Sequence, residues 1–199
     1  VDTVSGDLPA QIPADVVLLA TPDGAIPSLG RQLAEGSRLG GDTAVLHISG
    51  ALPAAALTEA GLTVPCGAMH PLQTLLGDGQ PRRPFSWALE GDEPALLRGR
   101  QLVRAMGCDH VTLEGVHKGR YHAAATMVSN HLVALARVAE RQMELAGVPP
   151  DRLPSLFMPL MAAAVENIER VGTAEALTGP VVRGDLATVA EHLAALADS

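Results

Sequence analysis

One short stretch of the chain, KGRYHAAATMVSN at residues 118–130, combines side chains that can move protons with an otherwise apolar composition. At about 100° per residue in a helix, Lys118, His122 and Ser129 lie within roughly 40° of one another, and Asn130 is on the neighbouring face. An amine, an imidazole, a hydroxyl and a carboxamide are costly to bury without partners. These groups therefore either meet a ligand or satisfy one another and the nearby loops.

The same stretch predicts the start of one long helix that runs to about Leu145. Strong helix formers dominate, and neither Gly nor Pro occurs between Arg120 and Ala146. Gly147, followed by two prolines, is a stop signal. This helix would place Lys118 and His122 at its beginning.

Buried strands come earlier in the chain. The apolar runs DVVLLA (15–20) and TAVLHI (43–48) are typical of strands covered on both faces of a parallel sheet. A shorter strand is expected at 66–69, and short helices at 25–35 and 53–60 complete a βαβαβ unit with right-handed crossovers. A Gly/Pro-rich connection (76–84), a strand (85–89), a helix (92–106) and a strand (110–113) follow.

From residue 116 onward the pattern predicts only helices. After the long helix we expect one at about 151–171, kinked at Pro159, and one at about 186–197, separated by the loop ALTGPVVRGD. The predicted boundary lies near Gly115. We therefore expect an α/β domain at 1–115 and a helical domain at 116–199.

Polar residues follow each predicted strand of the βαβαβ unit. Ligands of open parallel sheets bind beyond the carboxyl ends of the strands. If the helical domain packs against that edge, Lys118 and His122 approach His70 and Ser49, which gives an acid/base set for proton transfer coupled to carbonyl reduction. The strand-end residues are Thr21, Pro22, Asp23, His47, Ser49, Gly50, His70 and Pro71.

Each of these residues also has a structural interpretation. Asp23 is as typical of a helix N-cap as of a ligand contact. His47 and His70 could be hydrogen-bonded core residues, and Lys118 could be a solvated first-turn residue. Arg183 and Asp185 could pair or hold a tight turn. The remaining histidines have no companion at metal-ligand spacing, so we expect no metal site.

Composition excludes several classes of function. The net charge is −8 without an offsetting basic stripe, which argues against nucleic-acid binding. The apolar runs are too short for a membrane span, and no signal-peptide pattern opens the chain. Cys66 and Cys108 are far apart, as free thiols of a cytoplasmic protein would be.

Five motifs in order carry a family resemblance: ADVVLLATPDGAI, VLHISGAL, MHPLQTL, KGRYHAAATMVSNHLVAL and ALTGPVVRGDLATVAEHLAAL. Over residues 14–196 the chain resembles proteins that join a Rossmann-like NAD(P)-binding domain to a helical domain of unknown function, number 2520. That family resembles a distant branch of the 6-phosphogluconate, 3-hydroxyisobutyrate, prephenate and pyrroline-5-carboxylate enzymes. The resemblance implies an α/β fold, a Rossmann-like parallel sheet followed by an all-α domain of the 6-phosphogluconate dehydrogenase C-terminal type.

The resemblance also implies roles for residues. Lys118 and His122 match a lysine and a polar residue that serve the substrate in several of those enzymes, and His70 with Pro71 resembles the His-Pro element of prephenate dehydrogenases. The substrate side would add Ser129, Asn130 and Arg183. The nicotinamide of NAD or NADP would lie along the residues Thr21, Pro22, Asp23, His47, Ser49 and Gly50.

One feature of the family has no counterpart before Asp15: a first strand, a GxGxxG turn, a helix and a second strand. That turn holds the cofactor pyrophosphate. We therefore expect an N-terminally incomplete sheet, weak or absent dinucleotide binding by the chain as given, and a sheet edge that pairs with another segment, such as a second copy.

These observations favour an NAD(P)-dependent oxidoreductase acting on a small carbonyl, imine or hydroxy-acid substrate. The alternative is a non-catalytic binding or homodimerisation module built on the Ala-rich helices, since small residues permit close helix packing. A third hypothesis is a carboxylate sensor that uses Lys118 and Arg183 as anion anchors.

Overall fold

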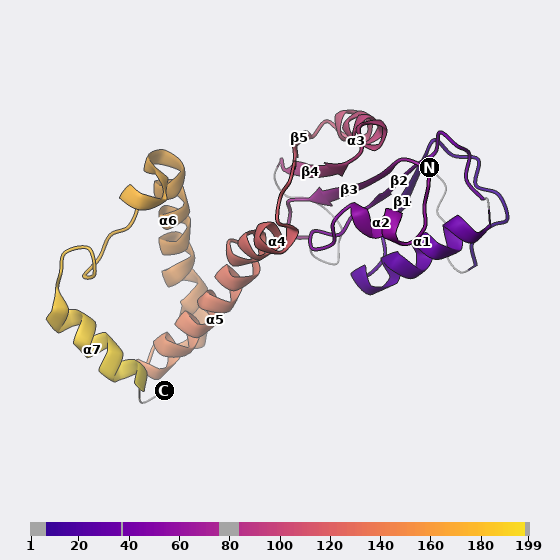
Figure 1. The fold of residues 1–199 in the computed structure, drawn as a ribbon. Coiled ribbons are helices and arrows are strands. Elements are labelled where there is room, and N and C mark those ends of the chain that lie inside the picture. Colours follow the sequence, from indigo (N-terminus) through magenta and orange to yellow (C-terminus); the bar gives the residue numbers. More distant parts are fainter. Residues whose placement is uncertain (1–6, 37, 76–83, 198–199) are drawn as a thin grey trace. The chain divides into compact units, whose positions relative to one another are not determined.

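The computed structural model describes residues 7–36, 38–75 and 84–197 and is drawn in Figure 1. The chain forms two compact units, Val1–Ser129 and Asn130–Ser199. The domain boundary that the sequence predicts near Gly115 stays a prediction. Most of the predicted connection at 76–84 lies outside the described residues.

A five-stranded sheet forms the centre of the first unit. The strands are β1 (Val16–Leu19), β2 (Ala44–His47), β3 (Cys66–Pro71), β4 (Ser86–Gly91) and β5 (Asp109–Thr112), in the order β1-β2-β3-β4-β5. β1, β2 and β3 pair in parallel, with α1 (Ile26–Glu35) and α2 (Ala55–Glu59) in the two connections. The βαβαβ unit predicted from the apolar runs is confirmed.

The sheet is mixed, because β4 runs antiparallel to β3. A parallel neighbour needs a crossover that is usually a helix. α3 (Glu93–Ala105) provides one between β4 and β5, and these two strands pair in parallel. Asp92 fixes the start of α3, because its carboxylate accepts hydrogen bonds from the backbone N–H of Ala95 (2.9 Å) and of Cys66 (2.8 Å).

Helices cover both faces of the sheet (Figure 1). Side chains alternate along a strand, so Val45 packs in one core cluster and Leu46 in the other. The α1–α2 side buries Leu19, Ile26, Leu33, Val45, Leu57, Leu62 and Cys66, and the α3 side buries Ala44, Leu46, Met69, Leu89, Ala95, Leu96 and Val103. This is a Rossmann-like α/β architecture, as the sequence predicted.

The prediction of one unbroken helix from Lys118 to Leu145 is wrong. α4 (Lys118–Met127) ends before α5 (Asn130–Leu145) begins. Thr126 Oγ1 donates a hydrogen bond to the carbonyl of His122 (2.9 Å), and Ser129 Oγ donates to the carbonyl of Ala125 (2.6 Å). Such bonds compete with the helical ladder and bend helices. α4 consequently belongs to the unit that contains the sheet.

The second unit is helical, as predicted. α5 is followed by a short 3-10 helix, η2 (Pro150–Arg152), then by α6 (Leu153–Glu175) and α7 (Leu186–Ala197). α6 carries Pro159 in its interior, and its non-helical residue is Gly172 (φ 83°), since glycine adopts positive φ at little cost. The kink at Pro159 stays a prediction. None of the helices in the described ranges is long and apolar enough to cross a membrane.

Candidate functional site

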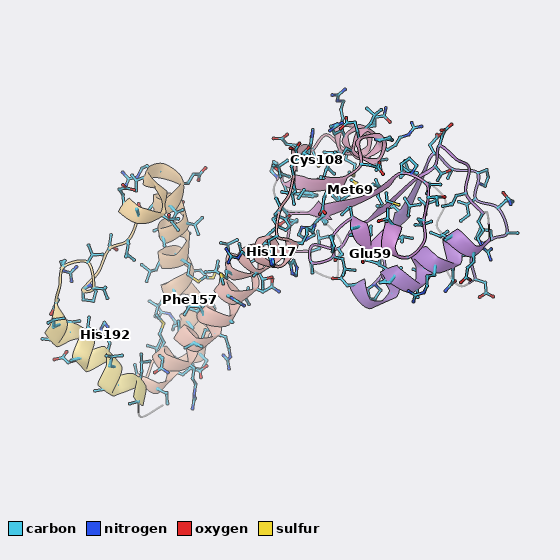
Figure 2. All side chains as sticks on the ribbon, viewed as in Figure 1. Glu59, Met69, Cys108, His117, Phe157 and His192 are labelled. Atoms are coloured by element: carbon cyan, nitrogen blue, oxygen red, sulfur yellow. The ribbon has the colours of Figure 1, made fainter. Side chains whose placement is uncertain are left out.

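The first turn of α4 buries a lysine. His117 caps the helix, with its Nδ1 accepting a hydrogen bond from the backbone N–H of Arg120 (3.3 Å), and it is labelled at the start of α4 in Figure 2. Lys118 follows and is only 6% exposed. Lysine is rarely buried to this extent unless its charge is compensated. The solvated first-turn interpretation of Lys118 is therefore wrong.

Glu90 compensates that charge. Nζ of Lys118 lies 3.4 Å from Oε2 of Glu90, an ion pair without hydrogen-bond geometry, since neither atom has a hydrogen-bond partner among the described residues. The other oxygen, Oε1, accepts a hydrogen bond from the backbone N–H of Ala54 (3.2 Å). The ammonium thus keeps N–H groups that nothing in the described chain accepts.

His70 and Tyr121 form the second pair of the site. Nδ1 of His70 lies 2.8 Å from the Tyr121 hydroxyl. Burial, and then the nearby charges of Lys118 and His122, lower the pKa of His70 to about 4, although Asp23 opposes the shift. Burial raises the pKa of Tyr121, whose ring centroid is 5.2 Å from Nζ of Lys118. Near neutral pH both side chains of this pair are uncharged.

His122 completes the cluster. Its ring centroid lies 5.9 Å from that of His70 in an edge-to-face arrangement. Both rings pack on Gly50, where an added Cβ would lie 2.6 Å from Cδ2 of His122 and 2.6 Å from Nε2 of His70. The structure therefore brings together His70, Lys118 and His122, as the sequence predicted, and places Gly50 against both rings. The predicted approach of Ser49 and the catalytic and cofactor roles assigned to these residues stay predictions.

His47 is fully buried, and both ring nitrogens have partners. Nε2 lies 3.2 Å from the carbonyl of Pro53, and Nδ1 accepts from the backbone N–H of Ser49 (3.3 Å). Burial lowers the pKa of His47. Oγ of Ser49 accepts from the backbone N–H of Ala51 and of Leu52. These two side chains shape the loop after β2, and their contact with a cofactor stays a prediction.

The loop after β1 is more open. Pro22 and Asp23 are exposed, and Asp23 begins a 3-10 helix, η1 (Asp23–Ala25), whose N-cap position is taken by Pro22. The N-cap interpretation of Asp23 is therefore wrong. Oγ1 of Thr21 is buried and has no hydrogen-bond partner in the described ranges. Buried hydroxyl groups in folded proteins usually have a hydrogen-bond partner, so Thr21 stands out in this loop.

Three predicted substrate residues lie elsewhere in the chain. Ser129 follows α4 and bonds Ala125, Asn130 begins α5, and Arg183 lies in the loop before α7. Both carboxylate oxygens of Asp185 accept hydrogen bonds from Thr188, so Asp185 caps α7 rather than pairing with Arg183. Asn130 and Arg183 belong to the second unit, and their substrate roles, like that of Ser129, stay predictions.

Sequence reasoning missed two members of the cluster, Glu90 and Tyr121. Glu90 is the last but one residue of β4 and pairs with Ala68, which in turn pairs with His47, so all three share the α1–α2 face of the sheet. A carboxylate directly after the strand predicted at 85–89 was the available signal for a partner of Lys118. Tyr121 is the single tyrosine and lies one helical turn after Lys118.

Several solved structures are similar to this chain in fold. Protein TM1727 from Thermotoga maritima is 28% identical over 88% of this chain and 67% of its own, with a TM-score of 0.71. A proposed NADP oxidoreductase from Bacteroides fragilis, BF3122, is 18% identical (94% and 70% covered; TM-score 0.73). A pyrroline-5-carboxylate reductase from Coxiella burnetii is 13% identical (94% and 70% covered; TM-score 0.60). The last two likenesses concern the fold alone.

Among curated proteins, no match to the chain was found. The sequence profile of the domain of unknown function DUF2520 matches residues 85–199, which is more than half of the chain and includes Glu90, Lys118, Tyr121 and His122. The chain belongs to the DUF2520 family.

Proposed function

We propose that the protein is an NAD(P)-dependent oxidoreductase that acts on a small carbonyl, imine or hydroxy-acid substrate. The observation that carries the proposal is the buried ammonium of Lys118, which has one carboxylate beside it and no hydrogen-bond acceptor among the described residues. It lies next to a neutral imidazole in a Rossmann-like unit. A buried charge with unused donors is typical of a site whose missing partner is a ligand.

The residues after β1 fit a nicotinamide cofactor. Thr21 supplies an unpaired buried hydroxyl that would bond the carboxamide, and the exposed Pro22 and Asp23 leave room beside it. The name of one similar structure, an NADP oxidoreductase, supports the same cofactor class. When bound, a nicotinamide supplies or accepts the hydride.

The chain's own residues would handle the proton. Lys118 would donate a hydrogen bond to the substrate oxygen or nitrogen and stabilise the negative charge that develops there. His70 and His122 would orient the substrate and exchange a proton with it. Glu90 would hold the ammonium in place, since the ion pair leaves other N–H groups of Lys118 for the substrate.

Cofactor titration tests this proposal. We expect NADPH or NADH to give a saturable fluorescence change with the full-length protein. Thr21→Val should weaken binding about tenfold, because it removes a hydrogen bond worth about 1.4 kcal/mol. Thr58→Val is the matched control, since Oγ1 of Thr58 is exposed and bonds only the Ala55 carbonyl of its own helix. No saturable signal with either cofactor would end the proposal.

A homodimerisation role is the second candidate. In the second unit only Leu153 and Phe157 are buried hydrophobic residues of the described chain, whereas large apolar residues such as Val133 (70% exposed), Leu160 (68%) and Leu186 (78%) are open. So small a buried core is not expected to hold three helices together alone. A second copy of the chain would cover these residues. Light scattering at micromolar concentration should report a dimer, and a monodisperse monomer would contradict it.

A further inference from the structure

We infer that Tyr121 is a positioning residue: its hydroxyl donates a hydrogen bond to Nδ1 of His70 and so fixes the tautomer in which Nε2–H faces the acceptor atom of a carbonyl or neutral imine ligand. The inference rests on the proposed function and deepens it. It names a donor for the substrate, a residue that orients this donor, and the chemical class of the atom that is bound.

Both partners of the Tyr121–His70 hydrogen bond are uncharged near neutral pH, so its direction depends on which of them is the better donor. Burial raises the pKa of Tyr121, so the phenol keeps its proton. The pKa of His70 is lowered to about 4, so the imidazole is neutral near pH 7 and one ring nitrogen must accept. The two atoms are 2.8 Å apart, and a phenol O–H is a better donor and a poorer acceptor than a neutral imidazole, so the arrangement we infer has the phenol donating to Nδ1 and the ring proton on Nε2.

Nε2 of His70 remains available for a ligand. This nitrogen makes no hydrogen bond within the described ranges. It is not fully buried either, so it retains access to solvent. Gly50 allows this placement, because a Cβ there would lie 2.6 Å from Nε2. The donor thus lies against the end of β2, in the same cluster as Lys118 and His122.

The charges around His70 favour an uncharged acceptor. The ammonium of Lys118 is already paired with Glu90, and the carboxylate of Asp23 is close enough to act on His70. A neutral imidazole adds no positive charge. A substrate carboxylate at Nε2 would be desolvated in a cluster that has no excess positive charge to compensate it. A carbonyl oxygen or an imine nitrogen is uncharged and needs only the hydrogen bond from Nε2–H.

Nitrogen NMR of the histidine rings tests the inference directly. The full-length protein is labelled with ¹⁵N, and the His70 signals at pH 7.5 are those that disappear in His70→Gln. We expect the pattern of the Nε2-protonated tautomer in the wild type and a mixture of tautomers in Tyr121→Phe, which removes only the hydroxyl. An Nδ1-protonated His70 in the wild type, or an unchanged pattern in Tyr121→Phe, would overturn the inference.

A glycine pair tests the placement of the ring. Gly50→Ala should displace the ring signals of His70 and His122, since its Cβ would overlap both rings. Gly41→Ala is the control, because no atom lies within 4 Å of its added Cβ. Unchanged signals in Gly50→Ala would contradict the packing on which the inference rests.

Cofactor titration separates this inference from the proposed function. Tyr121→Phe should bind NADPH or NADH within about twofold of the wild type, because a tenfold change would need about 1.4 kcal/mol of direct contact. Absence of cofactor binding in the wild type would end the proposed function, whereas the tautomer pattern of His70 decides the role of Tyr121 by itself.

Discussion

Lys118 depends on a single carboxylate for its burial. Its side chain is 5% exposed and that of Glu90 is 22% exposed, so the two partners are desolvated to different degrees. Removing one member of a buried pair leaves the other uncompensated, at a typical cost of about 3–5 kcal/mol. Because Glu90 retains some water, the cost here belongs at or below the lower end of that range.

Glu90→Gln should therefore lower the free energy of unfolding by about 2–3 kcal/mol, because it leaves the ammonium buried without a counterion. Lys118→Met should cost less, since the carboxylate left behind is the more exposed partner. Urea denaturation measures both. Glu93→Gln, which removes an exposed ion pair with Arg100, is the control and should cost less than about 1 kcal/mol. A larger loss of unfolding free energy in Lys118→Met than in Glu90→Gln would contradict the view that Lys118 is the more deeply buried partner of this ion pair.

The lowered pKa of His70 predicts a pH effect on stability. The unfolded ring takes up a proton near pH 6.5 and the folded ring only near pH 4, so between these values the unfolded state binds more protons. Stability should therefore fall as the pH is lowered from about 6.5 towards 4. Chemical denaturation across this range should show a shallower decline in His70→Gln. Parallel curves for the two proteins would show that His70 titrates normally.

At the residue scale the sequence predicted the chemical groups but not their neighbours. Lys118, His70 and His122 stood out by type and position. Glu90 did not, because only the pairing of β4 with β3 places it beside Ala68, on the face that carries His47. The structural interpretation of His47 also required coordinates, since its two ring nitrogens are bonded to backbone groups of the following loop.

The antiparallel pairing of β3 with β4 is the element that positions Glu90. Gly91 ends β4 at φ 144°, and an added Cβ would lie 2.5 Å from the carbonyl oxygen of Cys66 and 2.6 Å from Cα of Gly67. Only glycine fits so close a backbone approach. The spacing between these strands therefore depends on Gly91.

Gly91→Ala should destabilise the protein by several kcal/mol or prevent folding. The added Cβ strains the backbone at this positive φ and also forces β3 and β4 apart. Gly107→Ala provides the comparison: its φ is 67° and no atom lies within 4 Å of the added Cβ, so only the left-handed strain of about 1–2 kcal/mol is expected. Thermal unfolding compares the two. Similar losses of stability would show that the strands do not approach as closely as described.

Elements were predicted well where hydrophobic periodicity is strong and poorly where side chains interrupt a helix. The strands of the βαβαβ unit and the helix α7 follow from apolar runs and turn residues. The break between α4 and α5 does not, because helix formers flank it on both sides. It depends on where the hydroxyls of Thr126 and Ser129 bond, which sequence composition does not specify.

At the scale of the whole molecule, the two units differ in their cores: the sheet unit buries two hydrophobic clusters, whereas the helical unit buries only Leu153 and Phe157 among its described hydrophobic residues. The contrast follows from architecture, since a sheet covered on both faces encloses two cores. The three long helices of the other unit bury very little among themselves. Homodimerisation through the helical unit is the proposal that accounts for these residues.

Charged substitutions in the helical unit should weaken the dimer. Leu160→Glu combined with Leu193→Glu places charges at two apolar positions that are 68% and 64% exposed, so we expect a monomer by light scattering. Leu97→Glu is the control, because Leu97 is 51% exposed in α3 of the other unit and should leave the dimer intact. A dimer that persists in the double variant would exclude an interface through Leu160 and Leu193.

The central claim is that Lys118 and His70 serve a substrate reduced or oxidised by a nicotinamide. A crystal structure of the full-length protein with NADP⁺ or NAD⁺ tests it most directly. The account predicts the carboxamide within hydrogen-bond distance of Oγ1 of Thr21, and the reactive C4 carbon facing Nζ of Lys118 and Nε2 of His70. A nicotinamide bound away from both groups would contradict it.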